Sequence, residues 1–212
     1  MPLPDPFAYP RQPHQRKHGP AGYRHYGLYR SWLRDEWSFR CPYCLTRERW
    51  LSRPREWERD HFIAKKHRPD LALDYDNLVH ACAVCNGVKR SKHLPDPCVI
   101  AYGDLVEVWG DGGIRPRAGR EKEGQTLIEK MQLDDDGMNE LRRWIFLQIK
   151  SALKLGLGDP DGHALLKACL GFPDNLPDLS QEQPPGGNRR PQGIQQSYFE
   201  LSKKPGSLPE YY

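Results

Sequence analysis

The sequence predicts an α+β fold, in which a small unit bridged by cysteines lies among flanking helices and both chain ends are disordered. Three observations predict it. Two C-x-x-C pairs occur at residues 41–44 and 82–85. Apolar residues recur at helical spacing over residues 23–38 and 138–155. The chain of 212 residues also contains 20 prolines and 19 glycines, which indicates a large share of loop and tail.

The domain division follows from these changes in composition. Residues 1–21 are rich in Pro, Arg, His and Gln without apolar periodicity, which predicts a flexible basic arm. Residues 22–172 are expected to form the folded domain, with an N-terminal helix and a C-terminal helical extension. Residues 173–212 are expected to form a Pro/Gly-rich tail.

Within the folded domain, residues 23–38 predict an amphipathic helix whose aromatic residues belong to the core rather than to a base-stacking surface. "RDHFI" has the character of a strand, whereas the stretch from Asn77 to Cys82 is interpreted as a short helix before a cysteine turn and a second helix. A Gly-rich turn at Asp111 predicts a β-hairpin. Further helices are expected over residues 138–155 and 163–170.

Charge is unevenly distributed along the chain. Residues 1–93 hold 18 Lys and Arg against 10 Asp and Glu, whereas residues 94–212 hold 14 against 18. A basic patch on the half that carries the cysteine pairs suits a polyanion such as nucleic acid, although a solvated cationic surface accounts for it equally well.

No apolar run approaches the ~20 residues that span a bilayer. The first residues lack the apolar centre of a signal peptide, so we expect a cytoplasmic protein without a membrane partner.

The cysteine pairs predict a structural metal site. In a reducing compartment disulfides are disfavoured, so paired cysteines indicate metal binding. Cys41, Cys44, Cys82 and Cys85 can together supply the four thiolates of a tetrahedral zinc site. Such a closed site leaves no position for a reacting water, so we expect this zinc to be structural. Cys98 and Cys169 lie outside the pattern and are expected to be buried as small apolar residues.

Three stretches between and after the cysteines point to a family. They are "DHF" from Asp60, "YDNLVHAC" from Tyr75 and "CNGVKRSK" from Cys85. Together they resemble the HNH endonucleases, which have a zinc-bound ββα-metal core, and the resemblance covers residues 41–93. It implies a metal-dependent endonuclease that hydrolyses DNA, with RNA left open, and leaves a 5′-phosphate.

A looser similarity covers residues 94–155. It is to a branch of the family that supplies nuclease subunits of bacterial anti-phage systems, often beside an ATPase. That branch implies a nuclease effector of an anti-phage or restriction system, with such an ATPase as protein partner. It often has the pattern DHF-x-P-K, in which this chain has Ala64 in place of the proline.

The residues have suitable chemistry for phosphodiester hydrolysis. His61 titrates near neutral pH and suits a general base for water. Asp60 is a hard oxygen ligand for Mg²⁺ or Mn²⁺. The resemblance implies that Asp60 and Asn86 hold one catalytic metal on the scissile phosphate, and that Asn77 fixes the loop and orients His61. Basic residues expected to contact phosphates, or else to form a solvated surface, are Lys65, Lys66, Lys89, Arg90 and Lys92.

Two alternatives remain open at this stage. A non-catalytic zinc-knuckle module could bind nucleic acid or a protein partner, but it would not need Asp60, His61 and Asn86 together. The chain could also be a subunit that is silent until a partner assembles with it. No dedicated base-reading element such as a helix-turn-helix is visible, so we expect weak sequence specificity.

Overall fold

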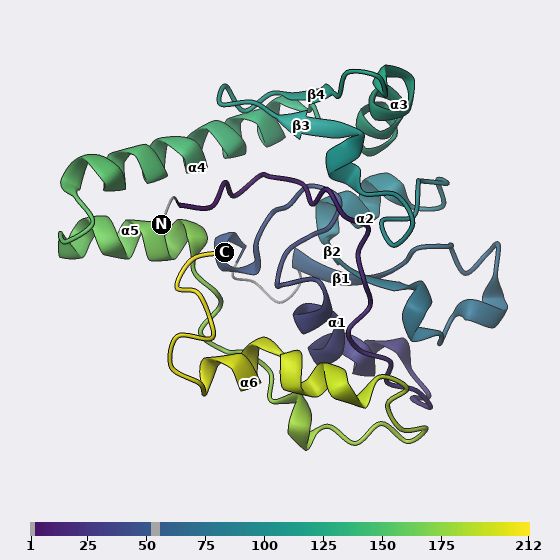
Figure 1. Ribbon diagram of the computed structural model, residues 1–212. Helices are drawn as coiled ribbons and strands as arrows, with labels where there is room; N and C mark the ends of the chain where they lie inside the picture. The colour runs from purple at the N-terminus through teal and green to yellow at the C-terminus, as the bar shows by residue number, and fades with distance from the viewer. Residues whose placement is uncertain (1–2, 52–55) are drawn as a thin grey trace. The chain divides into compact units, whose positions relative to one another are not determined.

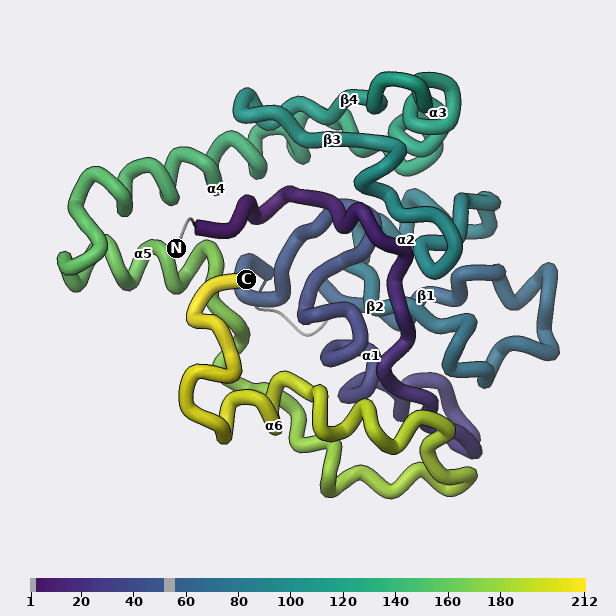
Figure 2. The backbone as a smooth tube through the Cα atoms, viewed as in Figure 1, coloured from purple at the N-terminus to yellow at the C-terminus, as the bar shows by residue number. Residues whose placement is uncertain are grey.

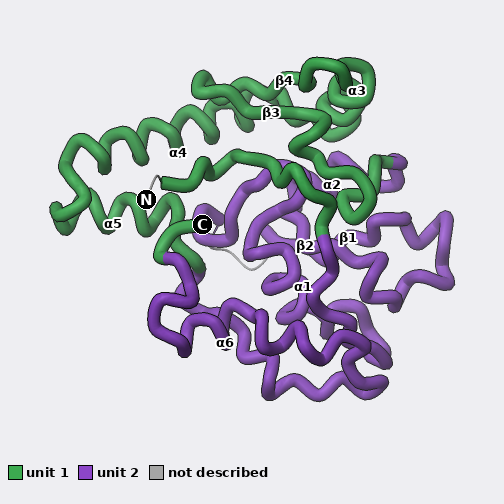
Figure 3. Tube along the Cα trace, viewed as in Figure 1, with its two compact units in different colours: residues 1–14, 94–172, 210–212 green, residues 15–93, 173–209 purple. Residues whose placement is uncertain are grey.

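The computed structural model describes residues 3–51 and 56–212. The chain forms two compact units, shown in different colours in Figure 3. Unit 1 contains residues 1–14, 94–172 and 210–212, and unit 2 contains residues 15–93 and 173–209. Short helices and small antiparallel sheets together give the predicted α+β fold.

Unit 2 contains a β-hairpin followed directly by a helix. Strand β1 (Trp57–His61) pairs antiparallel with strand β2 (Leu78–Cys82), with Asp60 opposite Val79 and His61 opposite Leu78. Helix α2 (Ala83–Lys89) starts where β2 ends and packs against both strands (Figure 1). The expectation of a short helix before the second cysteine pair is therefore wrong. All five β2 residues are buried, and a short apolar run has no periodicity that separates a buried strand from a helix.

The helix expected over residues 23–38 is present in a shorter form. A 3₁₀ turn, η1 (Tyr26–Tyr29), leads into helix α1 (Arg30–Glu36), which contacts β2. Trp32 and Leu33 are fully buried, so they have the core role that their spacing predicted. The helix ends before Ser38 and Phe39, which both have a left-handed backbone with φ of 54°.

Segments near both chain ends contribute to unit 2. The backbone N–H of Lys17 donates to Glu36 at 2.9 Å, and the Arg190 guanidinium forms an ion pair with Asp76 at 3.0 Å. Hydrogen bonds and ion pairs with acidic side chains therefore hold these two segments against the rest of unit 2, although neither segment has apolar periodicity. Short elements of unit 2 are η2 (Glu48–Trp50), η4 (Pro69–Leu71), η5 (Tyr75–Asn77), η7 (Leu179–Gln181), η8 (Pro191–Gln196) and α6 (Tyr198–Ser202).

Unit 1 contains the predicted hairpin, the two predicted helices and one helix, α3, that was not predicted. Its elements are η6 (Tyr102–Asp104), β3 (Val106–Val108), β4 (Ile114–Pro116), α3 (Glu121–Met131), α4 (Asp136–Leu155) and α5 (Pro160–Leu170). Gly112 has φ of +83° in the β3–β4 turn, a conformation that favours glycine. Helices α4 and α5 pack side by side in opposite directions (Figure 2). In the part of the chain that the structure describes, no helix is both long and apolar enough to cross a membrane.

Candidate active site

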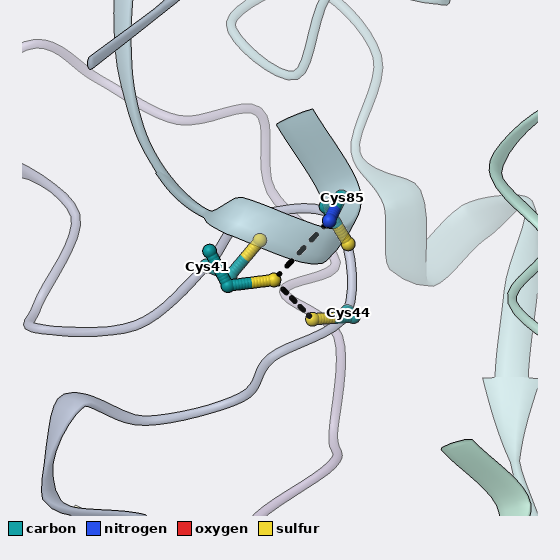
Figure 4. A group of neighbouring side chains, drawn as sticks. Cys41, Cys44 and Cys85 are labelled. Carbon is teal, nitrogen blue, oxygen red and sulfur yellow. Dashed lines mark hydrogen bonds between the residues drawn. The ribbon is translucent and has the colours of Figure 1, made fainter. Parts of the chain in front are cut away.

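The four predicted cysteines come together in unit 2. Their sulfur atoms all lie within 4.8 Å of one another, and at most 3% of each residue is exposed. Cys41 and Cys44 come from the loop before η2, while Cys82 ends β2 and Cys85 lies in the first turn of α2. Figure 4 shows the side chains of Cys41, Cys44 and Cys85 gathered at one end of a helix.

The sulfur arrangement suits a tetrahedral ion. A metal–sulfur distance of about 2.3 Å gives a tetrahedron with edges of about 3.8 Å. The Cys44 and Cys82 sulfurs are 3.7 Å apart. Burial raises the pKa of the Cys41 thiol well above its ordinary value, so a cation is needed to keep the whole cluster ionised. The Cys82 sulfur also accepts the Cys85 N–H at 3.4 Å, which ties the cluster to the first turn of α2.

Asp60 lies near the end of β1 and is held from two sides. Its carboxylate accepts a hydrogen bond from the Tyr43 hydroxyl at 2.7 Å and forms an ion pair with the Lys89 amine at 3.1 Å. Only 4% of Asp60 is exposed. Burial raises the pKa of Asp60, although Lys89 and Tyr43 both favour its ionised form. The carboxylate therefore has a fixed orientation.

His61 follows Asp60 on the strand and is held by the loop that leads to β2. Its Nε2 is 2.9 Å from the carbonyl oxygen of Ala72. Its ring packs edge-to-face against the Tyr26 ring, with 4.8 Å between the ring centres. A carbonyl oxygen can only accept, so Nε2 carries the proton and, in the neutral ring, Nδ1 keeps a lone pair. No partner of Nδ1 is found among the described residues. Burial lowers the pKa of His61, which favours this neutral form.

Asn77 connects the two ends of the loop between β1 and β2. Its amide oxygen accepts the Ile63 N–H at 2.8 Å, and its amide nitrogen donates to the carbonyls of Ile63 and Leu71 at 3.0 and 3.3 Å. The same loop supplies Ala72, the hydrogen-bond partner of His61. Asn77 therefore stabilises the backbone that holds the imidazole.

Asn86 lies on α2, one turn before Lys89. Residues three apart share a helix face, so Asn86 faces the same side as the amine that binds Asp60. Its side chain makes no hydrogen bond within residues 3–51 and 56–212 and is partly exposed. The carboxylate of Asp60 has four lone-pair positions, of which Tyr43 and Lys89 use no more than three. One carboxylate position and a free amide oxygen fit the oxygen ligands of a divalent cation such as Mg²⁺.

Four of the five basic residues expected at phosphates are exposed; they are Lys65, Lys66, Arg90 and Lys92. Lys89 differs from that expectation because its side chain is completely buried. Its amine donates to Asp60 and, at 2.8 Å, to the backbone carbonyl of His61. Lysine is almost never fully buried unless it is paired, and here the pair is formed with the strand that carries the candidate catalytic residues.

His80 and Glu48 form a further buried pair beside β1. The His80 ring stacks on Trp57 at 4.5 Å, and its Nε2 is 2.7 Å from Glu48. Burial would raise the pKa of Glu48, but hydrogen bonds from His80 and Arg34 outweigh it and lower the pKa to about 2. His80 is thus paired with a carboxylate and not with the cysteine cluster.

Three residues of this site were not predicted from the sequence. They are Tyr43, which binds Asp60, Tyr26, which contacts His61, and Ala72, whose carbonyl holds the imidazole. Tyr43 lies between Cys41 and Cys44, and this position next to the predicted zinc ligands is the one sequence feature that could have pointed to it. The contacts of Tyr26 and Ala72 depend on folding of the loop and have no local sequence signature.

Comparison with known families agrees with this geometry. Residues 41–92 match the family model described as HNH endonuclease. The match spans both cysteine pairs, β1, β2 and α2, and it indicates a nuclease domain that binds metal and acts on nucleic acid. No curated protein matches the chain.

Proposed function

We propose that this chain, whose residues 41–92 match the HNH endonuclease family model, is a metal-dependent nuclease that hydrolyses phosphodiester bonds of DNA. The observation that carries the proposal is the state of His61. Its Nε2 is committed to the Ala72 carbonyl, and no partner of its Nδ1 is found among the described residues. An imidazole with one nitrogen anchored and one lone pair available suits a general base that deprotonates water.

The neutral form of His61 is available at neutral pH. Burial lowers its pKa from the ordinary value, and the nearby Lys65 ammonium lowers it further, while the hydrogen bond to Ala72 opposes this shift. Because the proton of the neutral ring stays on Nε2, water is deprotonated by Nδ1. The proton taken from water gives an imidazolium that Asp60 helps to stabilise.

Asp60 and Asn86 are the residues that would hold the catalytic Mg²⁺ or Mn²⁺. When bound, such a cation offsets charge on the scissile phosphate and stabilises the leaving oxygen. Tyr43 and Lys89 fix the direction of the Asp60 carboxylate. Lys89 also anchors the carbonyl of His61, so one buried amine positions the two neighbouring residues.

The cysteine cluster is proposed to bind one structural zinc ion. It links the Cys41–Cys44 loop to the end of β2 and the start of α2. Tyr43 belongs to that loop, so the same ion positions the hydroxyl group that binds Asp60. A small ββα unit has little apolar core, and a rigid metal centre compensates for it. A role as effector of an anti-phage or restriction system, with an ATPase partner, is a further proposal supported only by the looser sequence similarity of residues 94–155.

The test is cleavage of supercoiled plasmid DNA by the zinc-loaded chain with Mg²⁺ or Mn²⁺. Removing a general base typically slows a reaction by about 10²- to 10⁴-fold, and we expect this loss for His61→Ala. His163→Ala is the matched control, because it removes a partly exposed histidine of unit 1 that lies outside the candidate site. Undiminished cleavage by His61→Ala would exclude His61 as the base. Absence of cleavage by the metal-loaded wild type, with DNA binding retained, would favour the non-catalytic zinc module.

A further inference from the structure

Two aromatic rings lead from His61 to the surface of unit 2. The Tyr26 ring contacts His61 at 4.8 Å, and the His25 ring stacks on Tyr26 at 4.8 Å with only 22° between the ring planes. His25 is exposed, while Tyr26 is partly buried. One face of the His25 ring lies on Tyr26, and the residue as a whole is exposed.

The exposed ring is held in place by local contacts. Nδ1 of His25 accepts the backbone N–H of Gly27 at 3.0 Å and so caps η1. A Cβ atom at residue 27 would lie 2.7 Å from that nitrogen, so glycine provides the space that the ring occupies. Fixing an exposed side chain costs conformational entropy, and this ring is fixed before any ligand is bound. Preorganised aromatic surfaces of this kind suit stacking with a flat ligand.

Positive charge surrounds the same rings. The Lys65 amine lies 4.7 Å from the centre of the Tyr26 ring and is exposed, and Lys66 beside it is also exposed. Lys65 is close enough to His61 to influence its charge. Cations next to exposed rings are the combination that binds single-stranded nucleic acid, in which the phosphates meet the charges and the bases stack on the rings.

We propose that His25, supported by Tyr26, is a stacking platform for an unpaired base next to the scissile phosphate. The proposed nuclease would therefore prefer DNA that is single-stranded or locally unpaired at the cut. A base inside an intact duplex has both faces covered by its neighbours and cannot reach the ring, whereas a base in a single strand or a bulge can. This inference rests on the proposed function, because it assigns a substrate class to the same site.

The experiment measures binding separately from cleavage. Zinc-loaded chain without added Mg²⁺ or Mn²⁺ is titrated into fluorescein-labelled single-stranded DNA, a fully paired duplex, and the same duplex with a central bulge of unpaired bases. A second set of oligonucleotides carries 2-aminopurine, whose fluorescence falls when it stacks. Wild type should prefer the single strand and the bulge, and should quench 2-aminopurine in both.

The main variant is His25→Asn, because asparagine can still cap η1 but has no ring. We expect it to weaken binding of the unpaired DNAs by about 5- to 150-fold, the range for losing one stacked base, and to abolish the quenching. Binding of the paired duplex should change little. His25→Phe restores a ring and should recover most of the affinity. Gly27→Ala keeps His25 but displaces its ring, so it should cause the same loss as His25→Asn.

Trp109→Ala is the matched control. Trp109 is an exposed aromatic of unit 1 with the Arg115 guanidinium 3.8 Å from its ring centre, and its removal should leave binding unchanged. Equal affinity of wild type and His25→Asn for the single strand would overturn the platform, even where the plasmid assay shows cleavage. If His25→Asn loses binding and quenching but wild type cuts no DNA, the platform stands and the nuclease proposal fails.

Discussion

Replacing Lys89 by methionine tests whether the buried amine stabilises the candidate active site. The change removes the ion pair with Asp60 at 3.1 Å and the hydrogen bond to the His61 carbonyl at 2.8 Å. Lys89 is 0% exposed and Asp60 is 4% exposed, so water cannot replace the lost contacts. Breaking a buried ion pair by removing one partner costs about 3–5 kcal/mol, whereas methionine fills a similar volume and adds little cavity cost.

The assay is urea unfolding of the zinc-loaded chain in a double-mutant cycle. We expect Lys89→Met to lower the free energy of unfolding by about 3–5 kcal/mol. Asp60→Asn alone should also destabilise, because it leaves a buried ammonium without its counter-charge. The double variant should lose less than the sum of the two, with a coupling energy of about 1–3 kcal/mol between neighbouring groups. Cleavage by Lys89→Met should fall by about 10²-fold, since small displacements of catalytic groups have effects of this size.

The control is Lys92→Met, which changes an exposed lysine of the same segment and should alter stability by less than about 0.5 kcal/mol. If Lys89→Met behaves like this control, or if the effects of the Asp60 and Lys89 changes are additive, the buried pair does not hold the strand.

Three further changes test other parts of unit 2. Cys82→Ser should reduce tightly bound zinc, measured by elemental analysis, from about one ion per chain to nearly none, while Cys98→Ser should retain it. Glu48→Gln removes a carboxylate whose pKa falls from 4.5 to about 2 on folding, a stabilisation of roughly 3 kcal/mol. That stabilisation is complete above pH 4.5 and is lost as the pH falls toward 2, so the difference in unfolding free energy between wild type and variant should shrink over this range. A difference in unfolding free energy that does not change with pH would exclude an ionised Glu48 carboxylate as the source of this stabilisation. Asn77→Ala leaves the N–H and C=O of Ile63 without their partner and should cost about 2–3 kcal/mol. Trypsin should then cut faster after Lys65 and Lys66, and an unchanged rate would show that Asn77 does not brace the loop.

The cysteine cluster and most helices could be predicted from local sequence features. Paired cysteines at short spacing carry their own geometric signal, and α4 and α5 have long apolar periodicities with acidic residues at their starts. Helix α3 was missed although Leu127, Ile128 and Met131 recur at helical spacing. Strand β2 was misassigned because its buried residues contain no alternation of polar and apolar side chains.

The positions of charged residues were the least predictable part of the site. A lysine after a cysteine pair resembles a surface cation in sequence, and only packing of α2 against β1 brings Lys89 to a carboxylate 29 positions away. The same limit applies to the chain ends. Their sequences lack apolar periodicity and predict disorder, but Lys17 and Arg190 find acidic partners that lie far away in sequence. Pairing of distant charges leaves no periodic pattern along a chain.

Helix α2 explains why the site needs two kinds of support. It has only seven residues, too few for a helix to be stable by itself. Cys82 and Cys85 hold its first turn through the cysteine cluster, and Lys89 holds its last turn through Asp60. Asn86 lies between these supports, so its position depends on both. Loss of the proposed zinc ion would free the first turn while the Lys89 contact remains. Metal removal should therefore disturb Asn86 more than His61, whose ring is held independently by the Ala72 carbonyl.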